Sequence, residues 1–208
     1  GFELVQNRGG NVEYVPIKQV VLNAHEKIEK ASKSKGTVTG IPTGFIDLDY
    51  KTSGLQPSDL ILVAARPSMG KTAFVLNIAQ HVAFKQNRTV AIFSLEMSKE
   101  QLVNRLFSLE SYVDAQLLRT GNLKDSDWEK LIEGAGTIGR SNLIIDDTPG
   151  ISISEMRSKC RKYKMEHNLE LIIIDYLQLM SGSVGGRNES RQQEISDISG
   201  SLKALARE

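Results

Sequence analysis

Short, fully apolar runs alternate along this chain with longer stretches in which apolar residues recur every three or four positions. The runs at 60–65, 90–95, 143–145 and 171–174 have the length of buried strands, and the stretches between them have the period of amphipathic helices. Buried strands that alternate with helices predict an α/β fold, in which a mostly parallel sheet carries helices on both faces. In such a sheet, ligands bind at the carboxyl ends of the strands.

Capping residues place some of the helix boundaries. Ser98 with Gln101, and Ser152 with Glu155, have the spacing of N-terminal capping boxes. They predict helices that begin after the second and third strands, the later one running to about His167. Apolar residues at helical spacing predict two further helices, one before the third strand and one at the end of the chain: Trp128, Leu131 and Ile132, then Ile195, Ile198, Leu202 and Leu205.

The N-terminal part of the chain consists of a helix and a polar linker. From Pro16 onward apolar residues recur at helical spacing, and polar residues 32–37 follow. We therefore expect residues 1–36 to form an N-terminal segment with an amphipathic linker helix, and residues 37–208 to form the α/β domain. The apolar stripe of the helix could pack on its own domain or on a neighbouring subunit. Because the last helix stops at Glu208 without a cap, we expect the domain to be incomplete at its C-terminus.

Composition is typical of a soluble globular protein and excludes several classes. Hydrophobic residues make up 40% of the chain, yet no apolar run approaches the roughly 20 residues needed to span a bilayer. There is no export signal, so we expect a cytoplasmic protein with no membrane partner. The net charge of +1 gives no sign of a nucleic-acid partner. The single cysteine, Cys160, excludes an intrachain disulfide and a cysteine-based zinc site.

A phosphate-binding motif lies between the first apolar run and the helix that follows it. Residues 65–72 are Ala-Arg-Pro-Ser-Met-Gly-Lys-Thr, a P-loop that begins with alanine in place of the usual glycine. Gly70 lets the backbone approach the phosphates, Lys71 reaches the β- and γ-phosphates, and the Thr72 hydroxyl ligates Mg²⁺. We predict an ATP and Mg²⁺ site whose nucleotide-binding residues are Arg66, Pro67, Ser68, Met69, Gly70, Lys71, Thr72 and Ala73.

Two carboxylates complete the predicted site. Asp175 ends the apolar strand 171–174, which is the Walker B arrangement, in which a carboxylate reaches Mg²⁺ through its water shell. Glu96 follows the second strand at the same edge and is the candidate base that orients and deprotonates the attacking water. Asp146 and Asp147 also follow a strand and compete for this role, although their Asp-Asp-Thr-Pro-Gly context is typical of a turn.

Positive charge gathers in two further places. One run in a predicted helix is typical of a solvated face and consists of Lys159, Arg161, Lys162 and Lys164. The other pair, Arg187 and Arg191, flanks a glycine-rich loop after the Walker B strand. Because such a loop can project into a channel, Arg187 and Arg191 are candidate contacts for single-stranded DNA.

Taken together, the motifs of this chain resemble the ATPase domain of DnaB-type replicative DNA helicases. The alanine that opens the P-loop fits this family, and the resemblance covers nearly the whole chain from about Pro16. Besides the P-loop, the motifs that carry it are residues 43–49 (TGFIDLD), 53–55 (SGL), 59–60 (DL), 93–98 (FSLEMS), 174–180 (IDYLQLM) and 202–208 (LKALARE).

The resemblance implies a RecA-like P-loop fold and a homohexameric ring that uses Mg-ATP hydrolysis to move 5′ to 3′ along single-stranded DNA and unwind duplexes. It makes Glu96 and Lys71 catalytic, assigns Thr72 and Asp175 to Mg²⁺, and implies primase and a helicase loader as partners. The helix from Pro16 resembles the linker helix that docks on the adjacent subunit. The family's arginine finger and main DNA-binding loop fall outside this sequence, so we expect the chain to bind nucleotide and hydrolyse it weakly.

Three other functions compete with this interpretation. A RecA-like ATPase of another class, such as a clock-type or recombination ATPase, shares the P-loop and Glu96. A non-enzymatic module would use the nucleotide only to hold subunits together. A metabolic nucleotide kinase would need an acceptor pocket and a lid, for which the sequence gives no signal.

Overall fold

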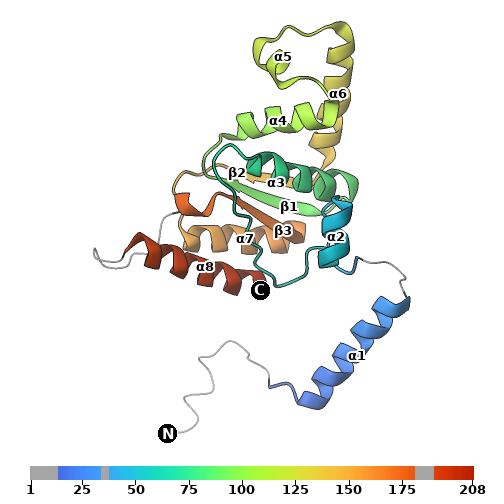
Figure 1. The fold of residues 1–208 in the computed structure, drawn as a ribbon, viewed down its shortest axis with the longest axis vertical. Helices are drawn as coiled ribbons and strands as arrows, with labels where there is room; N and C mark the ends of the chain where they lie inside the picture. The colour runs from blue at the N-terminus through green and yellow to red at the C-terminus, as the bar shows by residue number, and fades with distance from the viewer. Residues whose placement is uncertain (1–13, 34–37, 181–189) are drawn as a thin grey trace.

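The computed structural model describes residues 14–33, 38–180 and 190–208 as a parallel sheet with helices on both faces (Figure 1). The strands are β1 (Thr89–Ser94), β2 (Leu143–Asp146) and β3 (Leu169–Asp175), in the order β2-β1-β3. The helices are α1 (Ile17–Lys33), α2 (Ile46–Thr52), α3 (Lys71–Gln80), α4 (Lys99–Ser111), α5 (Ala115–Thr120), α6 (Asp125–Arg140), α7 (Ile153–His167) and α8 (Arg191–Arg207), with a π-helical turn η1 (His81–Lys85) and a 3₁₀ turn η2 (Leu177–Leu179).

The central strand β1 is buried along its whole length. Ala91 and Phe93 point into one hydrophobic cluster and Val90 and Ile92 into another, because successive side chains of a strand face opposite sides of the sheet. The apolar run that predicts this strand is therefore explained by burial on both faces.

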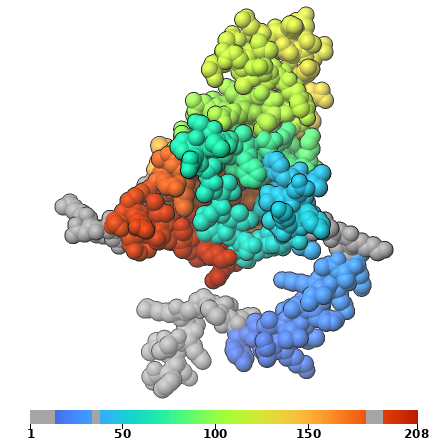
Figure 2. All heavy atoms as spheres, in the orientation of Figure 1, coloured from blue at the N-terminus to red at the C-terminus, as the bar shows by residue number. Residues whose placement is uncertain are grey.

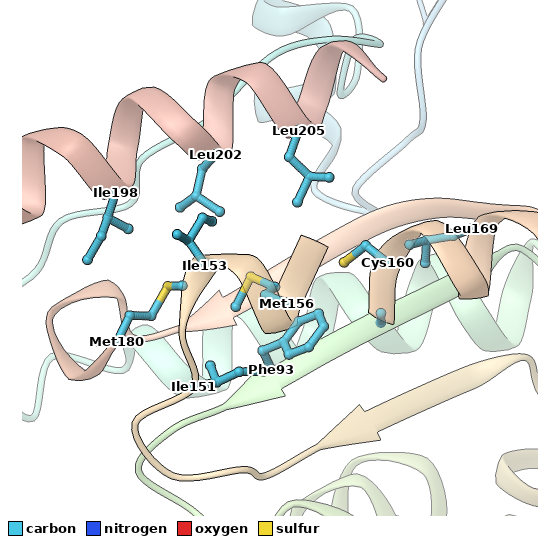
Figure 3. Close-up of a cluster of buried hydrophobic side chains, with 11 residues drawn as sticks. Phe93, Ile151, Ile153, Met156, Cys160, Leu169, Met180, Ile198, Leu202 and Leu205 are labelled. Carbon is cyan, nitrogen blue, oxygen red and sulfur yellow. The ribbon is translucent and has the colours of Figure 1, made fainter. Parts of the chain in front are cut away.

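Helices α7 and α8 cover one face of the sheet. Figure 3 shows Ile198, Leu202 and Leu205 of α8 pointing toward α7 and the sheet, where Met156 and Phe93 are fully buried. The opposite face is covered by α3, η1 and α4, whose apolar side chains surround Val90 and Ile92 of β1. The predicted α/β architecture with both faces covered is confirmed.

The prediction of a strand at 60–65 is wrong. The structure assigns no strand to these residues, and Ile61 and Leu62 are 53% and 68% exposed. An apolar run indicates only that a segment can be buried, whereas a strand also needs a neighbour that offers ladder hydrogen bonds. Only Leu60 packs against the hydrophobic cluster beneath α8.

The predicted helix boundaries are confirmed at several ends. Ser98 and Gln101 form a full capping box at the start of α4. The Ser152 side chain accepts a hydrogen bond from Glu155 N at 3.2 Å, and α7 ends at His167. These caps satisfy N–H groups that the first turn of a helix leaves without intrahelical partners.

Two parts of the structure stand outside this core. Figure 2 shows the α5–α6 region (yellow-green) as a protrusion at one end of the molecule. Helix α1 has no buried residue, so its apolar stripe has no cover within the described chain.

None of the helices that the structure describes is long and apolar enough to cross a membrane.

The protrusion is joined to the core by a close contact between α4 and α6. Gly134 of α6 lies against Ser111 of α4, and a Cβ added at Gly134 would overlap with the Ser111 Oγ atom. Both residues are buried. A side chain at position 134 would therefore push the two helices apart.

We expect Gly134→Ala to destabilise the chain by about 1–3 kcal/mol, because this overpacking outweighs the gain in helix propensity. Gly139 lies on the same helix, and an added Cβ there meets nothing within 4 Å. Gly139→Ala should therefore be neutral or stabilising by up to about 1 kcal/mol. Urea unfolding measures both, and equal free energies of unfolding for the two variants would show that the α4–α6 contact is not tight.

Candidate nucleotide-binding site

The P-loop lies at the N-terminus of α3, and residues 65–70 are exposed. Its backbone turns tightly, with Met69 N donating to Arg66 O at 3.3 Å. Ser68 and Gly70 have φ angles of 65° and 84°, in the left-handed region that favours glycine. Because Gly70 caps α3, the free N–H groups and the positive dipole end of this helix lie at the loop, where they favour an anion.

Asp175 joins the P-loop helix to the end of β3. Its Oδ2 atom accepts a hydrogen bond from Thr72 Oγ1 at 2.9 Å, and Lys71 Nζ lies 3.5 Å from its Oδ1 atom. Lys71 Nζ also lies 4.2 Å above the centre of the Tyr176 ring, a cation–π contact. The structure therefore brings together three predicted residues, Lys71, Thr72 and Asp175, and adds Tyr176.

The oxygens around Asp175 suit a magnesium ion. Asp175 is 5% exposed, and its Oδ1 atom is buried without a hydrogen-bond donor. A hydroxyl and a carboxylate are hard oxygen ligands, and Mg²⁺ uses one or two of these together with waters and substrate phosphates. No group of three or more His, Cys, Asp or Glu residues that could hold a metal occurs among the described residues. The chain thus offers a partial oxygen site of the kind that a nucleotide completes.

Glu96 lies in the turn between β1 and α4, and the residue before it, Leu95, contacts Asp175. Ser94 is the register partner of Asp175 across the β1–β3 pair, and Leu95 N donates to Asp175 O at 2.9 Å. Glu96 is exposed at this edge of the sheet, as predicted from its place after the strand. Its side chain is therefore open to solvent at the edge where β3 ends in Asp175.

Asp146 and Asp147, the predicted rivals of Glu96, are both engaged by the protein. Asp146 accepts hydrogen bonds from Thr148 N at 2.9 Å and from Lys159 Nζ at 2.7 Å. Asp147 accepts one from Lys99 N at 3.0 Å. The hydrogen bond from Thr148 N to Asp146 confirms the predicted turn. Because both aspartates accept hydrogen bonds from the protein, Glu96 is the less engaged of the three carboxylates.

The predicted solvated face of α7 is wrong for Lys159. This side chain is 29% exposed and pairs with Asp146 and with Glu155, the latter at 3.4 Å. Burial alone would raise the pKa of Asp146, but the hydrogen bonds from Lys159 and Thr148 outweigh it and lower that pKa. The hydrogen bond to Asp146 likewise raises the pKa of Lys159.

Several other predicted or potential site residues lie away from the P-loop contacts. The Arg191 guanidinium donates to the backbone carbonyls of Gln178 and Met180 and pairs with Glu194 at 2.8 Å. Arg187 lies outside the described residues. Burial raises the pKa of the Cys160 thiol to about 12, so this cysteine stays protonated and unreactive.

A P-loop at a helix N-terminus, bonded to an aspartate at the end of a neighbouring parallel strand, defines a P-loop nucleotide-binding domain. The sequence profile of the DnaB-like helicase C-terminal domain matches residues 40–208. The chain belongs to this family, and the family implies nucleotide use.

Relatives and solved structures agree with this assignment. The chain is 53% identical to the replicative DNA helicase DnaC of Bacillus subtilis (strain 168) and 54% identical to the replicative DNA helicase DnaB of Geobacillus stearothermophilus. Each match covers 98% of this chain and 45% of the relative, so the chain spans less than half the length of these two helicases.

Two solved structures share the fold. The ATPase domain of G40P superposes with a TM-score of 0.86 at 36% identity, over 94% of this chain and 68% of that one. A DnaB-like replicative helicase, described with its interactions with primase, gives a TM-score of 0.81 at 36% identity, over 96% of this chain and 47% of that one. The RecA-like fold predicted from the resemblance is confirmed.

We expect Lys159→Ala to lower the free energy of unfolding by about 1–2 kcal/mol near pH 7, because it removes a charge-assisted hydrogen bond to a half-buried carboxylate. The folded-state pKa of Asp146 is depressed, so its contribution is present at neutral pH and lost as the pH falls through that pKa. The difference between wild type and variant should therefore shrink below about pH 4.

Urea unfolding across pH 2 to 8 would test this, with the exposed Lys162→Ala on the same helix as control. A difference that stays constant down to the lowest pH would contradict the assigned role of the Asp146–Lys159 pair.

Proposed function

We propose that the protein containing this chain is an ATP-dependent replicative DNA helicase, and that residues 37–208 form its RecA-like ATPase domain. In this proposal, Mg-ATP hydrolysis drives 5′ to 3′ movement along single-stranded DNA and unwinding of the duplex. The observation that carries the proposal is the grouping of Lys71, Thr72 and Asp175 at one edge of the sheet, in a chain of the DnaB-like family.

Each residue of the site has a part in hydrolysis. The N–H groups of the loop from Arg66 to Ala73 would hold the phosphates, and Lys71 would neutralise charge on the β- and γ-phosphates. Thr72 and Asp175 would hold Mg²⁺, which draws charge from the phosphate oxygens when it is bound. Glu96 would orient the attacking water and accept its proton.

The complete site needs a second copy of the protein. The DnaB-like family implies a homohexameric ring, and an arginine from the neighbouring subunit would add a rate factor of roughly 10³ or more. The uncovered apolar stripe of α1 supports a linker helix within residues 1–36 that docks on that neighbour. Primase and a helicase loader are the further partners, and the cytoplasm is the proposed location.

Single-stranded DNA would pass through the ring. Arg187 and Arg191 remain the proposed contacts from this chain, because they flank the segment that follows the Walker B strand. Arg191 would first have to release the carbonyls of Gln178 and Met180, to which it is now bonded.

The magnesium role of Asp175 can be measured through nucleotide affinity. We expect Asp175→Asn to weaken binding of Mg-ATP by roughly 10- to 100-fold, because Asp175 would orient the water shell of the ion. ATP binding in EDTA should change much less, since Lys71 and the loop remain. Asp47→Asn, an exposed acid on α2, is the charge-matched control. An equal loss of affinity with and without Mg²⁺ would exclude this role.

The central test is ATP hydrolysis by the full-length protein, with and without single-stranded DNA, in wild type, Lys71→Ala and Glu96→Gln. We expect DNA to stimulate hydrolysis, and we expect both variants to lose at least about 100-fold in rate. Lys71→Ala should also lose nucleotide affinity, whereas Glu96→Gln should keep it.

Other outcomes would favour the competing functions. Hydrolysis that does not respond to DNA would indicate a RecA-like ATPase that acts on another partner. Unwinding by Glu96→Gln at the wild-type rate would indicate that hydrolysis through Glu96 is not needed and that the nucleotide serves only to hold subunits together.

A further inference from the structure

The turn that carries Glu96 connects β1 to α4 and is held firmly at its strand end. Leu95 N donates to Asp175 O, and Ser94 Oγ donates to Met97 O at 2.8 Å. The first hydrogen bond joins the turn to the neighbouring strand, and the second closes the turn on itself. The position of Leu95 is therefore fixed relative to Asp175.

The helix end of the same turn is held by the residue that follows a different strand, β2. Lys99 is the first residue of α4, and its N–H donates to the Oδ2 atom of Asp147 at 3.0 Å. This N–H belongs to the first turn of a helix, where no intrahelical acceptor exists. The negative charge of Asp147 also suits the positive end of the helix dipole.

Asp147 is itself placed by rigid neighbours. It follows Asp146, the last residue of β2, which is the register partner of Phe93 in the fully buried strand β1. The Asp146 side chain accepts hydrogen bonds from Thr148 N and from Lys159 Nζ. Asp147 is therefore the first residue after a paired strand, next to a side chain that is itself hydrogen-bonded.

Glu96 has no such support of its own. Its side chain is exposed, and no described residue forms a hydrogen bond or ion pair with it. Its direction is therefore set by the backbone of the turn between Leu95 and Lys99, which Asp175 holds at one end and Asp147 at the other.

We infer that Asp147 is a positioning residue for Glu96: it fixes the α4 end of the turn through Lys99 N and so holds the backbone that carries the Glu96 carboxylate at the carboxyl edge of the sheet. This inference rests on the proposed role of Glu96 as the base. It also gives the two adjacent acids at the end of β2 separate tasks, since Asp146 holds the turn that follows β2 and Asp147 holds the turn before α4.

Two substitutions remove the hydrogen bond between Lys99 N and Asp147. Asp147→Ala removes the acceptor, and Lys99→Pro removes the donor and leaves Asp147 in place. Asp147→Asn is the conservative variant, because it keeps an oxygen that can accept the hydrogen bond. Proline is well tolerated at the first position of a helix, and the extended backbone of Ser98 (φ −70°, ψ 161°) accepts a following proline.

The experiment is single-turnover hydrolysis of radiolabelled ATP by the full-length protein, together with the Kd for ATP. Asp147→Ala should lower the hydrolysis rate about tenfold, because a base displaced by a fraction of an ångström loses much of its effect. The Kd should change less than about twofold, since the P-loop is untouched. Asp147→Asn should stay within about threefold of wild type.

Lys99→Pro should reproduce the loss seen with Asp147→Ala, and combining the two should add nothing. Lys99→Ala keeps the N–H and loses only the ammonium, 3.9 Å from Asp147 Oδ1, so its loss should be smaller than that of Lys99→Pro. Asp114→Ala is the matched control: Asp114 caps α5 through Gln116 N, and its removal should leave the hydrolysis rate unchanged.

The decisive variant is Asp147→Ala in the Glu96→Gln background. If Asp147 acts through Glu96, the double variant hydrolyses ATP no more slowly than Glu96→Gln alone. A full tenfold further loss, or a wild-type rate for Asp147→Ala, would overturn the inference. Asp147→Asn as inactive as Glu96→Gln would make Asp147 the base and overturn it as well. Failure of the proposed function is distinguishable, since Glu96→Gln would then hydrolyse ATP at the wild-type rate.

Discussion

The carboxylate of Asp175 is the point at which the functional parts of this domain meet. It accepts a hydrogen bond from the Thr72 hydroxyl of the P-loop helix and lies beside the Lys71 ammonium. The main-chain carbonyl of the same residue accepts a hydrogen bond from Leu95 N, in the turn that carries Glu96. Because Asp175 is 5% exposed at the end of a strand, its position is set by the sheet, and the P-loop and the turn are placed relative to it.

The register of the parallel sheet is the reason these groups lie together. Phe93 is paired with Asp146 on one side of β1 and Ile174 on the other, so the ends of the three strands lie at one edge. Slippage of one strand by a single residue would turn every side chain to the opposite face and break both hydrophobic clusters. The clusters above and below β1 therefore determine the geometry of this edge.

Much of this arrangement could be predicted from sequence because its signals are local. A capping box uses residues three positions apart, and a buried parallel strand is a short apolar run, so α4, α7 and β1 to β3 follow from the chain itself. The contact between Thr72 and Asp175 spans 103 positions, and the two motifs predict only that both residues lie at one Mg²⁺ site.

Contacts without such motifs could not be predicted. Nothing local distinguishes Lys159, which reaches back to Asp146, from the exposed Lys162 on the same helix. Tyr176 lies in the 174–180 motif, but nothing in that motif indicates its contact with Lys71. The apolar run 60–65 is the reverse case: its local signal for a strand is strong, but the prediction is wrong because no described strand pairs with it.

Four carboxylates near one edge of the sheet differ in role because they differ in partners. Asp175 lies between a hydroxyl and an ammonium, which is the setting of a metal-organising group. Asp146 is held by Lys159, with a lowered pKa, and Asp147 is held by a backbone N–H. Glu96 is the exposed member without a bonded partner among the described residues, which leaves its oxygens free for a substrate water. A base must accept a proton from the water that it orients, so a carboxylate whose oxygens accept no hydrogen bond from the described residues supports the proposed role of Glu96.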